Sequence, residues 1–126
     1  MVKKRVVITG VGTVNPLGNN YDEFIKNLFE GKNAISVDDS LESSGIETNL
    51  LALVKDFKLR KHLPNKKMRK LLNNGEGYGL VSAIQAMNDS LILSERDIAK
   101  EDFGIFLGCT KEFAPFDRIT ESLEAS

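Results

Sequence analysis

The sequence alternates short apolar runs with stretches of helical periodicity, and this alternation restricts the fold more than any other feature. Residues 5–9 are a β-branched run that ends at Gly10 and Gly12, which is typical of a buried strand followed by a tight loop. Asn20 then precedes apolar residues at helical spacing, and Gly31 follows them as a terminator. The first quarter of the chain therefore predicts a strand, a loop and a helix.

The middle of the chain predicts a connection, a second strand and a long helical stripe. Residues 32–49 are polar without a sustained period and predict a surface connection, whereas residues 50–57 predict a strand. Pro64 and Asn65 predict the start of a helix. Its apolar stripe contains Met68, Leu71, Leu72, Val81, Ile84, Met87 and Leu91. Three glycines inside the stripe indicate a break or a closely packed face, because each costs about 1 kcal/mol in a helix interior. They are Gly75, Gly77 and Gly79.

The end of the chain completes an α/β pattern. Residues 103–108 predict a third strand, and Pro115 predicts the start of a last helix. Alternating strands and helices predict an α/β fold with strands paired in parallel through right-handed crossovers. A chain of 126 residues has the size of one domain, and so few helices barely cover both faces of a parallel sheet. We therefore expect exposed apolar surface. Because the last helix has no terminator, we also expect the chain to be part of a longer protein.

The composition excludes several classes of protein and site. With 41% hydrophobic and 28% charged residues, the chain matches soluble globular proteins and not disordered ones. No apolar stretch approaches the roughly 20 residues that cross a bilayer, and none resembles a signal peptide. We expect a cytoplasmic protein without a membrane span. One cysteine, Cys109, and one histidine, His62, provide neither an internal disulfide nor a zinc site, and we expect no cofactor.

A formal net charge of −1 hides a strongly basic stretch over residues 55–70, which we call the basic segment. It contains eight basic residues and one acidic residue, a local charge of +7, whereas the rest of the chain amounts to −8. Such a concentration of charge creates a positive field that attracts an acidic partner. Taken alone, the pattern is equally typical of a solvated face that keeps a protein soluble.

Taken one at a time, the residues support no active site. The loop after the first strand lacks the third glycine of dinucleotide-binding loops, because Asn15 stands there and Pro16 follows it. A P-loop is excluded because no Gly-Lys-Ser/Thr sequence occurs. Cys109 follows a predicted strand, but the only histidine is far away in sequence, which favours a small packing residue over a nucleophile. Asp38 and Asp39 lie in a polar stretch and indicate a turn.

Five segments of the chain carry the pattern of a known family. The opening segment, residues 4–19 (KRVVITGVGTVNPLGN), is the most specific. Four further matches follow in the same order, namely residues 24–35 (FIKNLFEGKNAI), 54–57 (VKDF), 66–68 (KKM) with 83–90 (AIQAMNDS), and 103–108 (FGIFLG). Together these segments resemble the β-ketoacyl-acyl-carrier-protein synthases, the condensing enzymes of fatty-acid and polyketide synthesis. The resemblance covers nearly the whole chain.

The resemblance implies a partial thiolase-like fold. Residues 1–126 would form the N-terminal part of the first half of a five-layered α/β/α/β/α body, with no second domain. The family transfers an acyl group to a cysteine at a helix N-terminus and condenses it with decarboxylated malonyl-carrier protein, assisted by two histidines. The motifs of these residues lie beyond this chain, so no catalytic residue is expected here and the segment alone is expected to be inactive. Cys109 occupies the position of a glycine-rich turn.

The resemblance also gives the basic segment a partner, the acyl carrier protein. Lys66 and Lys67 match positions that face the acidic recognition helix of the carrier protein in related synthases. Their neighbours Arg60, Lys61 and Lys70 have no individual match. Opposite charges on the two surfaces raise the association rate and orient the partners. We therefore expect docking of a carrier protein here, and no nucleic-acid partner.

Two departures from the family pattern allow an alternative. Lys111 and Glu112 stand in the usually small, glycine-rich turn, near the acyl pocket and the dimer contact of relatives. Arg69 replaces the acid that commonly follows the Lys-Met pair. Both changes fit a non-catalytic ketosynthase-like subunit that shapes a dimer. The resemblance thus leaves open a catalytic homodimer or a ketosynthase-type heterodimer.

Overall fold

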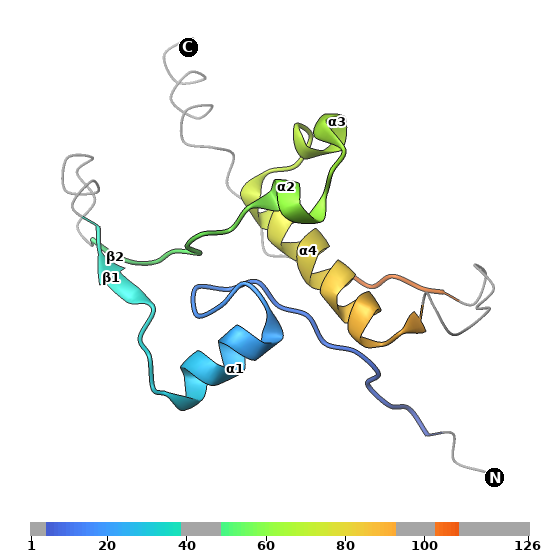
Figure 1. Ribbon diagram of the computed structural model, residues 1–126, viewed down its shortest axis with the longest axis horizontal. Coiled ribbons are helices and arrows are strands. Elements are labelled where there is room, and N and C mark those ends of the chain that lie inside the picture. Colours follow the sequence, from blue (N-terminus) through green and yellow to red (C-terminus); the bar gives the residue numbers. More distant parts are fainter. Residues whose placement is uncertain (1–4, 39–48, 93–102, 109–126) are drawn as a thin grey trace.

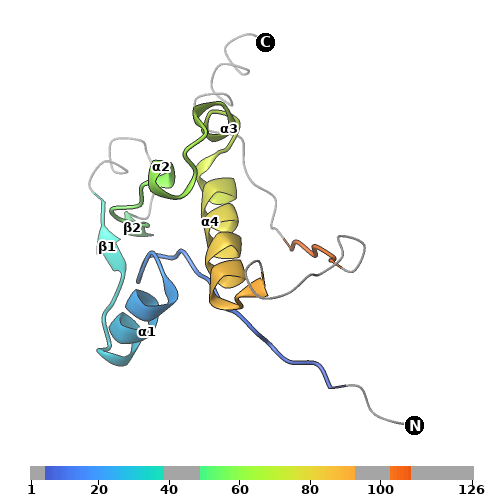
Figure 2. The same ribbon diagram turned by 45° about the vertical axis from the view of Figure 1, so that its right-hand side comes forward.

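The structure is a computed structural model that describes residues 5–38, 49–92 and 103–108. Its elements are, in chain order, α1 (Tyr21–Phe29), β1 (Ile35–Val37), β2 (Leu50–Ala52), α2 (Leu59–His62), α3 (Lys66–Arg69) and α4 (Asn74–Asp89). Figures 1 and 2 show α4 as the longest element, with the N-terminal segment beside it and α2 near its first turns. None of the helices in these ranges has the length and apolar character needed to cross a membrane.

The helix α1 begins and ends where the sequence predicts. Asn20 Oδ1 accepts a hydrogen bond of 2.9 Å from Glu23 N, which satisfies one of the free N–H groups of the first turn. Asp22 and Glu23 lie near the positive end of the helix dipole. After the last turn, Gly31 adopts a left-handed φ of 67°. The residues inside and beside α1 therefore determine its bounds.

The sheet differs from the predicted parallel sheet of three strands. β1 and β2 form one antiparallel pair, with Ile35 opposite Ala52. β1 lies within residues 32–49, so the prediction of a surface connection there is wrong for this part, and β2 ends well before the end of the strand predicted over residues 50–57. Strands this close in sequence pair antiparallel without a crossover helix, which a parallel pair requires.

The other two predicted strands do not form. Residues 5–9 and 103–108 have no strand pairing, and Val6, Ile8 and Phe106 are 95%, 88% and 99% exposed. A strand needs a neighbour that satisfies its backbone N–H and C=O groups, and neither run has one in the described part of the chain. The prediction of exposed apolar surface is confirmed for these residues.

The predicted helical stripe over residues 65–91 is divided into two helices. Asn65 caps α3 as predicted. A new helix, α4, then starts after Asn73, whose side chain and that of Glu76 form a reciprocal capping box. The box satisfies N–H groups that a helix start would otherwise leave unpaired, so it favours a break at this point. The helix predicted from Pro115 lies outside the described residues.

The core lies along α4. Val81 is the only buried hydrophobic side chain among the residues that the structure describes. Gly77 is also buried, and a Cβ at this position would lie 3.4 Å from Leu59 Cδ2 on α2. This is an ordinary contact with a side chain, and a Cβ at Gly79 would meet nothing within 4 Å, so neither glycine packs against a second backbone.

Candidate functional site

The basic segment forms α2, α3 and the turns beside them. Arg60 and Lys61 lie on α2, Lys66 and Lys67 lie on α3, and Lys70 is the C-cap of α3. All five residues are exposed. Because α2 and α3 contact each other, the structure brings the two helices that carry the five predicted docking residues together beside the start of α4 (Figure 1).

Aromatic contacts anchor α2 to α4. The ring of Phe57 meets that of Tyr78 edge-on at a centroid distance of 4.9 Å, and it stacks against His62 at 6.2 Å. α2 has no side-chain N-cap, and a single helical turn is unstable by itself. Packing of Phe57 and Leu59 against α4 therefore positions Arg60 and Lys61. The stacking of His62 on Phe57 joins residues of the basic segment that no sequence pattern paired.

Arg69 differs from the other cations of the basic segment. Its Nη1 donates hydrogen bonds to the carbonyl oxygens of Leu63 at 2.6 Å and Pro64 at 2.5 Å. These bonds join α3 to the turn that follows α2. A guanidinium has several N–H donors and no acceptor, so arginine is suited to this contact.

The exposed lysines of α3 have no partner within residues 5–38, 49–92 and 103–108. Lys66, Lys67 and Lys70 make no side-chain hydrogen bond or ion pair there. α3 has no acidic residue in its first turn. Unpaired like charges on one face create a positive potential that extends about 8–10 Å at ordinary salt concentrations. This face can attract an anionic surface.

A tight turn joins the N-terminal segment to α1. Asn15 and Gly18 exchange two backbone hydrogen bonds of 3.0 Å, and Asn15 Oδ1 accepts a third bond from Leu17 N. A polar pocket of about 270 Å³ lies beside this turn, and Asn19 and Lys55 are among the residues that line it. Asn19 Nδ2 donates to the carbonyl oxygen of Lys55 at 2.9 Å, which ties the turn to the start of the basic segment.

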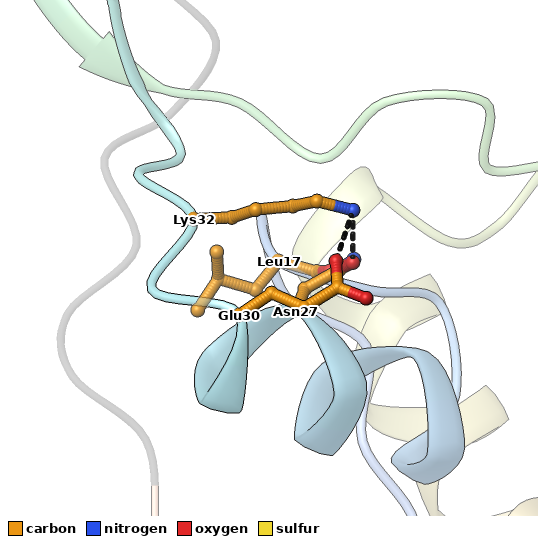
Figure 3. Close-up of polar contacts among 4 residues, drawn as sticks. All are labelled: Leu17, Asn27, Glu30 and Lys32. Atoms are coloured by element: carbon orange, nitrogen blue, oxygen red, sulfur yellow. Dashed lines mark hydrogen bonds and ion pairs between the residues drawn. The ribbon is translucent and has the colours of Figure 1, made fainter.

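Polar contacts hold the same turn to α1, as Figure 3 shows. Asn27 Nδ2 donates to the carbonyl oxygen of Leu17 at 2.5 Å. Lys32 Nζ contacts both Asn27 Oδ1 at 2.7 Å and Glu30 Oε2 at 2.9 Å. The hydrogen bond from Lys32 keeps the pKa of the exposed Glu30 carboxyl below its ordinary value.

The glycine loop near the N-terminus packs on α4. A Cβ at Gly12 would lie 2.0 Å from the carbonyl oxygen of Ser82, and Gly10 approaches the same helix as closely one turn later. Val11 N donates to Asp89 Oδ2 at 2.9 Å. The two glycines therefore allow close backbone contact with α4, and an N–H between them is already paired with a protein carboxylate.

The amino-acid sequence matches a family of known proteins. Residues 3–125 match the family described as Beta-ketoacyl synthase, N-terminal domain. The chain belongs to this family. The resemblance drawn from the sequence is therefore confirmed over almost the whole chain.

Curated relatives of the chain include 3-oxoacyl-[acyl-carrier-protein] synthases. Synthase 2 of Vibrio harveyi is 34% identical over 109 residues, which are 86% of this chain and 26% of the relative. Synthase 1 of Buchnera aphidicola subsp. Schizaphis graminum is 30% identical over 105 residues, 83% of this chain and 26% of the relative. Synthase 2 of Staphylococcus aureus strain N315 is 29% identical over 105 residues, which are 83% of this chain and 25% of the relative. The chain thus spans about a quarter of the length of these relatives.

The structure revises part of the residue assignments. Cys109, Lys111 and Glu112 lie outside the described residues. Within those residues, no group of three His, Cys, Asp or Glu side chains is arranged to hold a metal ion. Met68 and Leu71, assigned to an apolar packing stripe, are 47% and 82% exposed. The capping residues Asn73 and Glu76 are the sequence signal that could have indicated this exposure. They start a new helix, so the apolar residues before and after them do not lie on one continuous helix face.

Proposed function

We propose that the chain is the N-terminal part of a β-ketoacyl-acyl-carrier-protein synthase, a cytoplasmic acyltransferase of fatty-acid or polyketide synthesis. In such an enzyme a cysteine thiolate takes the acyl group from its carrier. Malonyl-carrier protein loses CO2, and the carbanion attacks the acyl thioester, which releases the thiolate and leaves a β-ketoacyl-carrier protein. Family membership and the names of the relatives support this proposal.

The proposal places the nucleophilic cysteine and both histidines outside these 126 residues. The complete enzyme would have the five-layered thiolase-like body and form a dimer. The alternative of a non-catalytic partner subunit rests on Lys111 and Glu112, which lie outside the described residues, and on Arg69, which has a structural contact of its own. No observation favours that alternative over the enzyme.

Within this segment we assign carrier-protein docking to the exposed cations of α2 and α3. The observation that supports this role is the group of unpaired lysines on α3, next to the two cations of α2. A carrier protein presents an acidic helix, so the two surfaces attract each other before contact. The contacts are exposed and therefore sensitive to salt.

A double charge reversal tests the docking role. We expect Lys66→Glu with Lys67→Glu to weaken binding of acyl carrier protein to this chain by about 1–3 kcal/mol, because attraction becomes repulsion. Binding can be followed by NMR titration of isotope-labelled Vibrio harveyi acyl carrier protein. The difference between variants should shrink between roughly 0.1 M and 1 M salt, as the Debye length falls from about 10 Å to about 3 Å.

The matched control reverses two exposed cations away from the basic segment. Arg5→Glu with Lys26→Glu changes the net charge by the same amount, and we expect most of the affinity to remain. Equal losses in the two double variants would indicate a general charge effect. An unchanged low-salt affinity in the Lys66 and Lys67 variant would reduce the basic segment to a solvated face.

A further inference from the structure

A single Asn-Gly pair stands at the start of α4. Of the asparagines in the sequence, only Asn74 precedes a glycine. Asn74 is the first residue of α4, and both it and Gly75 are exposed. Because glycine has no Cβ, its backbone nitrogen is open to approach by the preceding side chain. The chain thus places an unhindered peptide nitrogen directly after an amide side chain that water can reach.

The N–H of Gly75 donates to no acceptor in the part of the chain that the structure describes. The N–H groups that follow it are paired. Glu76 N donates to Asn73 Oδ1 at 2.8 Å, and Gly77 N donates to the carbonyl oxygen of Asn73 at 3.0 Å. The first N–H groups of a helix have no partner within that helix. The nitrogen of Gly75 is therefore free to lose its proton and act as a nucleophile.

We propose that Asn74 is a site of spontaneous deamidation. The nitrogen of Gly75 attacks the side-chain carbonyl carbon Cγ of Asn74, the bond from Cγ to Nδ2 breaks, and ammonia leaves with the proton of Gly75. Water then opens the cyclic imide at either of its carbonyl carbons. Opening at Cγ gives aspartate, and opening at the main-chain carbonyl carbon gives isoaspartate, whose backbone runs through the side chain. The reaction needs only water, and the inference is independent of the proposed function.

The capping box controls the rate of this reaction. The cyclic imide forms only when ψ of Asn74 leaves its helical value, so the first turn of α4 has to open. Two bonds of 2.8 Å oppose the opening, from Glu76 N to Asn73 Oδ1 and from Asn73 N to Glu76 Oε2. Because loss of an N-cap side chain destabilises a helix start, the open turn becomes more populated without it. Asn73 and Glu76 therefore slow the deamidation of Asn74.

The two products differ in their effect on the start of α4. Isoaspartate at residue 74 adds a methylene group to the backbone between Asn73 and Glu76, so the two parts of the capping box no longer align. Gly77, which packs beside Leu59 of α2, lies in the same turn. Aspartate keeps the backbone and adds an acid to the first turn, where the helix dipole favours it. Isoaspartate thus loosens the contact of α4 with α2, whereas aspartate preserves it.

Peptide mapping by mass spectrometry tests the site. The full chain is incubated in warm, mildly alkaline buffer, which favours the deprotonated nitrogen, and fragment ions locate each exchange of an amide for a carboxyl group. We expect aspartate and isoaspartate at residue 74, while Asn88 is the internal control and stays largely unmodified. Gly75→Ala is the matched variant and should remain unmodified, because its Cβ hinders the attack.

Two outcomes would overturn the site. One is an intact Asn74 in the folded chain after an incubation in which the chain unfolded in guanidinium chloride deamidates there. The other is equal modification of Asn74 in Gly75→Ala and in the unmodified chain, since the glycine nitrogen would then not be the nucleophile.

Three variants test the control by the capping box. Asn73→Ala should raise the rate at Asn74 in the folded chain by about threefold to tenfold, the increase in open turn expected from loss of a cap. Glu76→Ala should change the rate in the same direction, whereas Glu76→Gln keeps the capping bond and should match the unmodified chain. In guanidinium chloride all these chains should react alike. Unchanged rates in both folded alanine variants would overturn the role of the capping box.

Discussion

Two neighbouring cations of α3 show that residues of the same charge serve different purposes. Arg69 donates to two carbonyl oxygens of its own chain, whereas Lys70 has no side-chain partner among the residues described. A guanidinium presents several donors in a planar arrangement and bonds to backbone oxygens while it remains charged. Arg69 therefore contributes to the shape of the docking surface, and Lys70 contributes to its charge.

Replacing Arg69 should destabilise the chain more than replacing its neighbour. We expect Arg69→Met to lower the free energy of unfolding by about 1 kcal/mol, because it removes one partly buried and one exposed hydrogen bond to carbonyl oxygens. Lys70→Met, the matched control, should stay within about 0.5 kcal/mol of the unmodified chain. Urea denaturation followed by circular dichroism measures both. Equal stabilities would show that the two carbonyl bonds contribute nothing measurable.

Among the elements, α4 organises the described part of the molecule. α2 packs beside Gly77, and the N-terminal segment runs along α4 at Gly12. Hydrogen bonds from Val11 N to Asp89 and from Thr13 N to Gln85 hold that segment. α4 thereby links the family's opening motif to the helices that carry the basic segment.

Adding a methyl group at two glycines should have opposite effects. Gly12→Ala should destabilise the chain by about 1–3 kcal/mol, because its Cβ would overlap the carbonyl oxygen of Ser82 and force the backbones apart. Gly79→Ala should stabilise it by about 0.5–1 kcal/mol, because nothing lies within 4 Å and alanine favours the helix. Thermal unfolding of both variants provides the comparison. If Gly12→Ala were as stable as the unmodified chain, the contact with α4 would be ruled out.

At the scale of the whole molecule, exposed apolar side chains outnumber buried ones in the described residues. Of the side chains that the structure describes, Val81 is the one buried hydrophobic residue, while Ile8 and Phe106 are 88% and 99% exposed. Both lie in apolar runs whose backbone groups have no strand partner within residues 5–38, 49–92 and 103–108. Surface of this kind favours association with other chains, because unpaired edges accept further strands.

The isolated chain should therefore self-associate. Light scattering over a concentration series should show a rising mean mass, and thermal melts should be broad. Ile8→Lys with Phe106→Lys should reduce association by placing charges on the two unpaired runs. Phe29→Lys, at a residue 85% exposed on α1, is the control and should have a smaller effect. A compact monomer with a sharp melting transition would contradict this prediction.

The parts predicted correctly depend on short-range interactions. Asn20 and Asn65 were expected to start helices, and both side chains accept bonds from N–H groups two or three residues ahead. Gly31 was expected to end α1, and its left-handed φ needs no distant contact. The family could also be read from the sequence, because its opening motif is specific and the further matches keep their order. The basic segment was visible from charge alone.

Tertiary structure decided everything that depends on a distant partner. The β-branched run over residues 5–9 has the composition of a strand, but a strand exists only when another backbone pairs with it. Gly12 and Asp89 are far apart in sequence, and only folding brings the N-terminal segment onto α4. The exposure of Leu71 likewise follows from the direction of α3 and the new helix start after it. The sequence thus determined caps, charges and family, because these rest on neighbouring residues or on the order of motifs. Strand pairing, close packing and the composition of the exposed surface required the folded chain, because they depend on which distant groups meet.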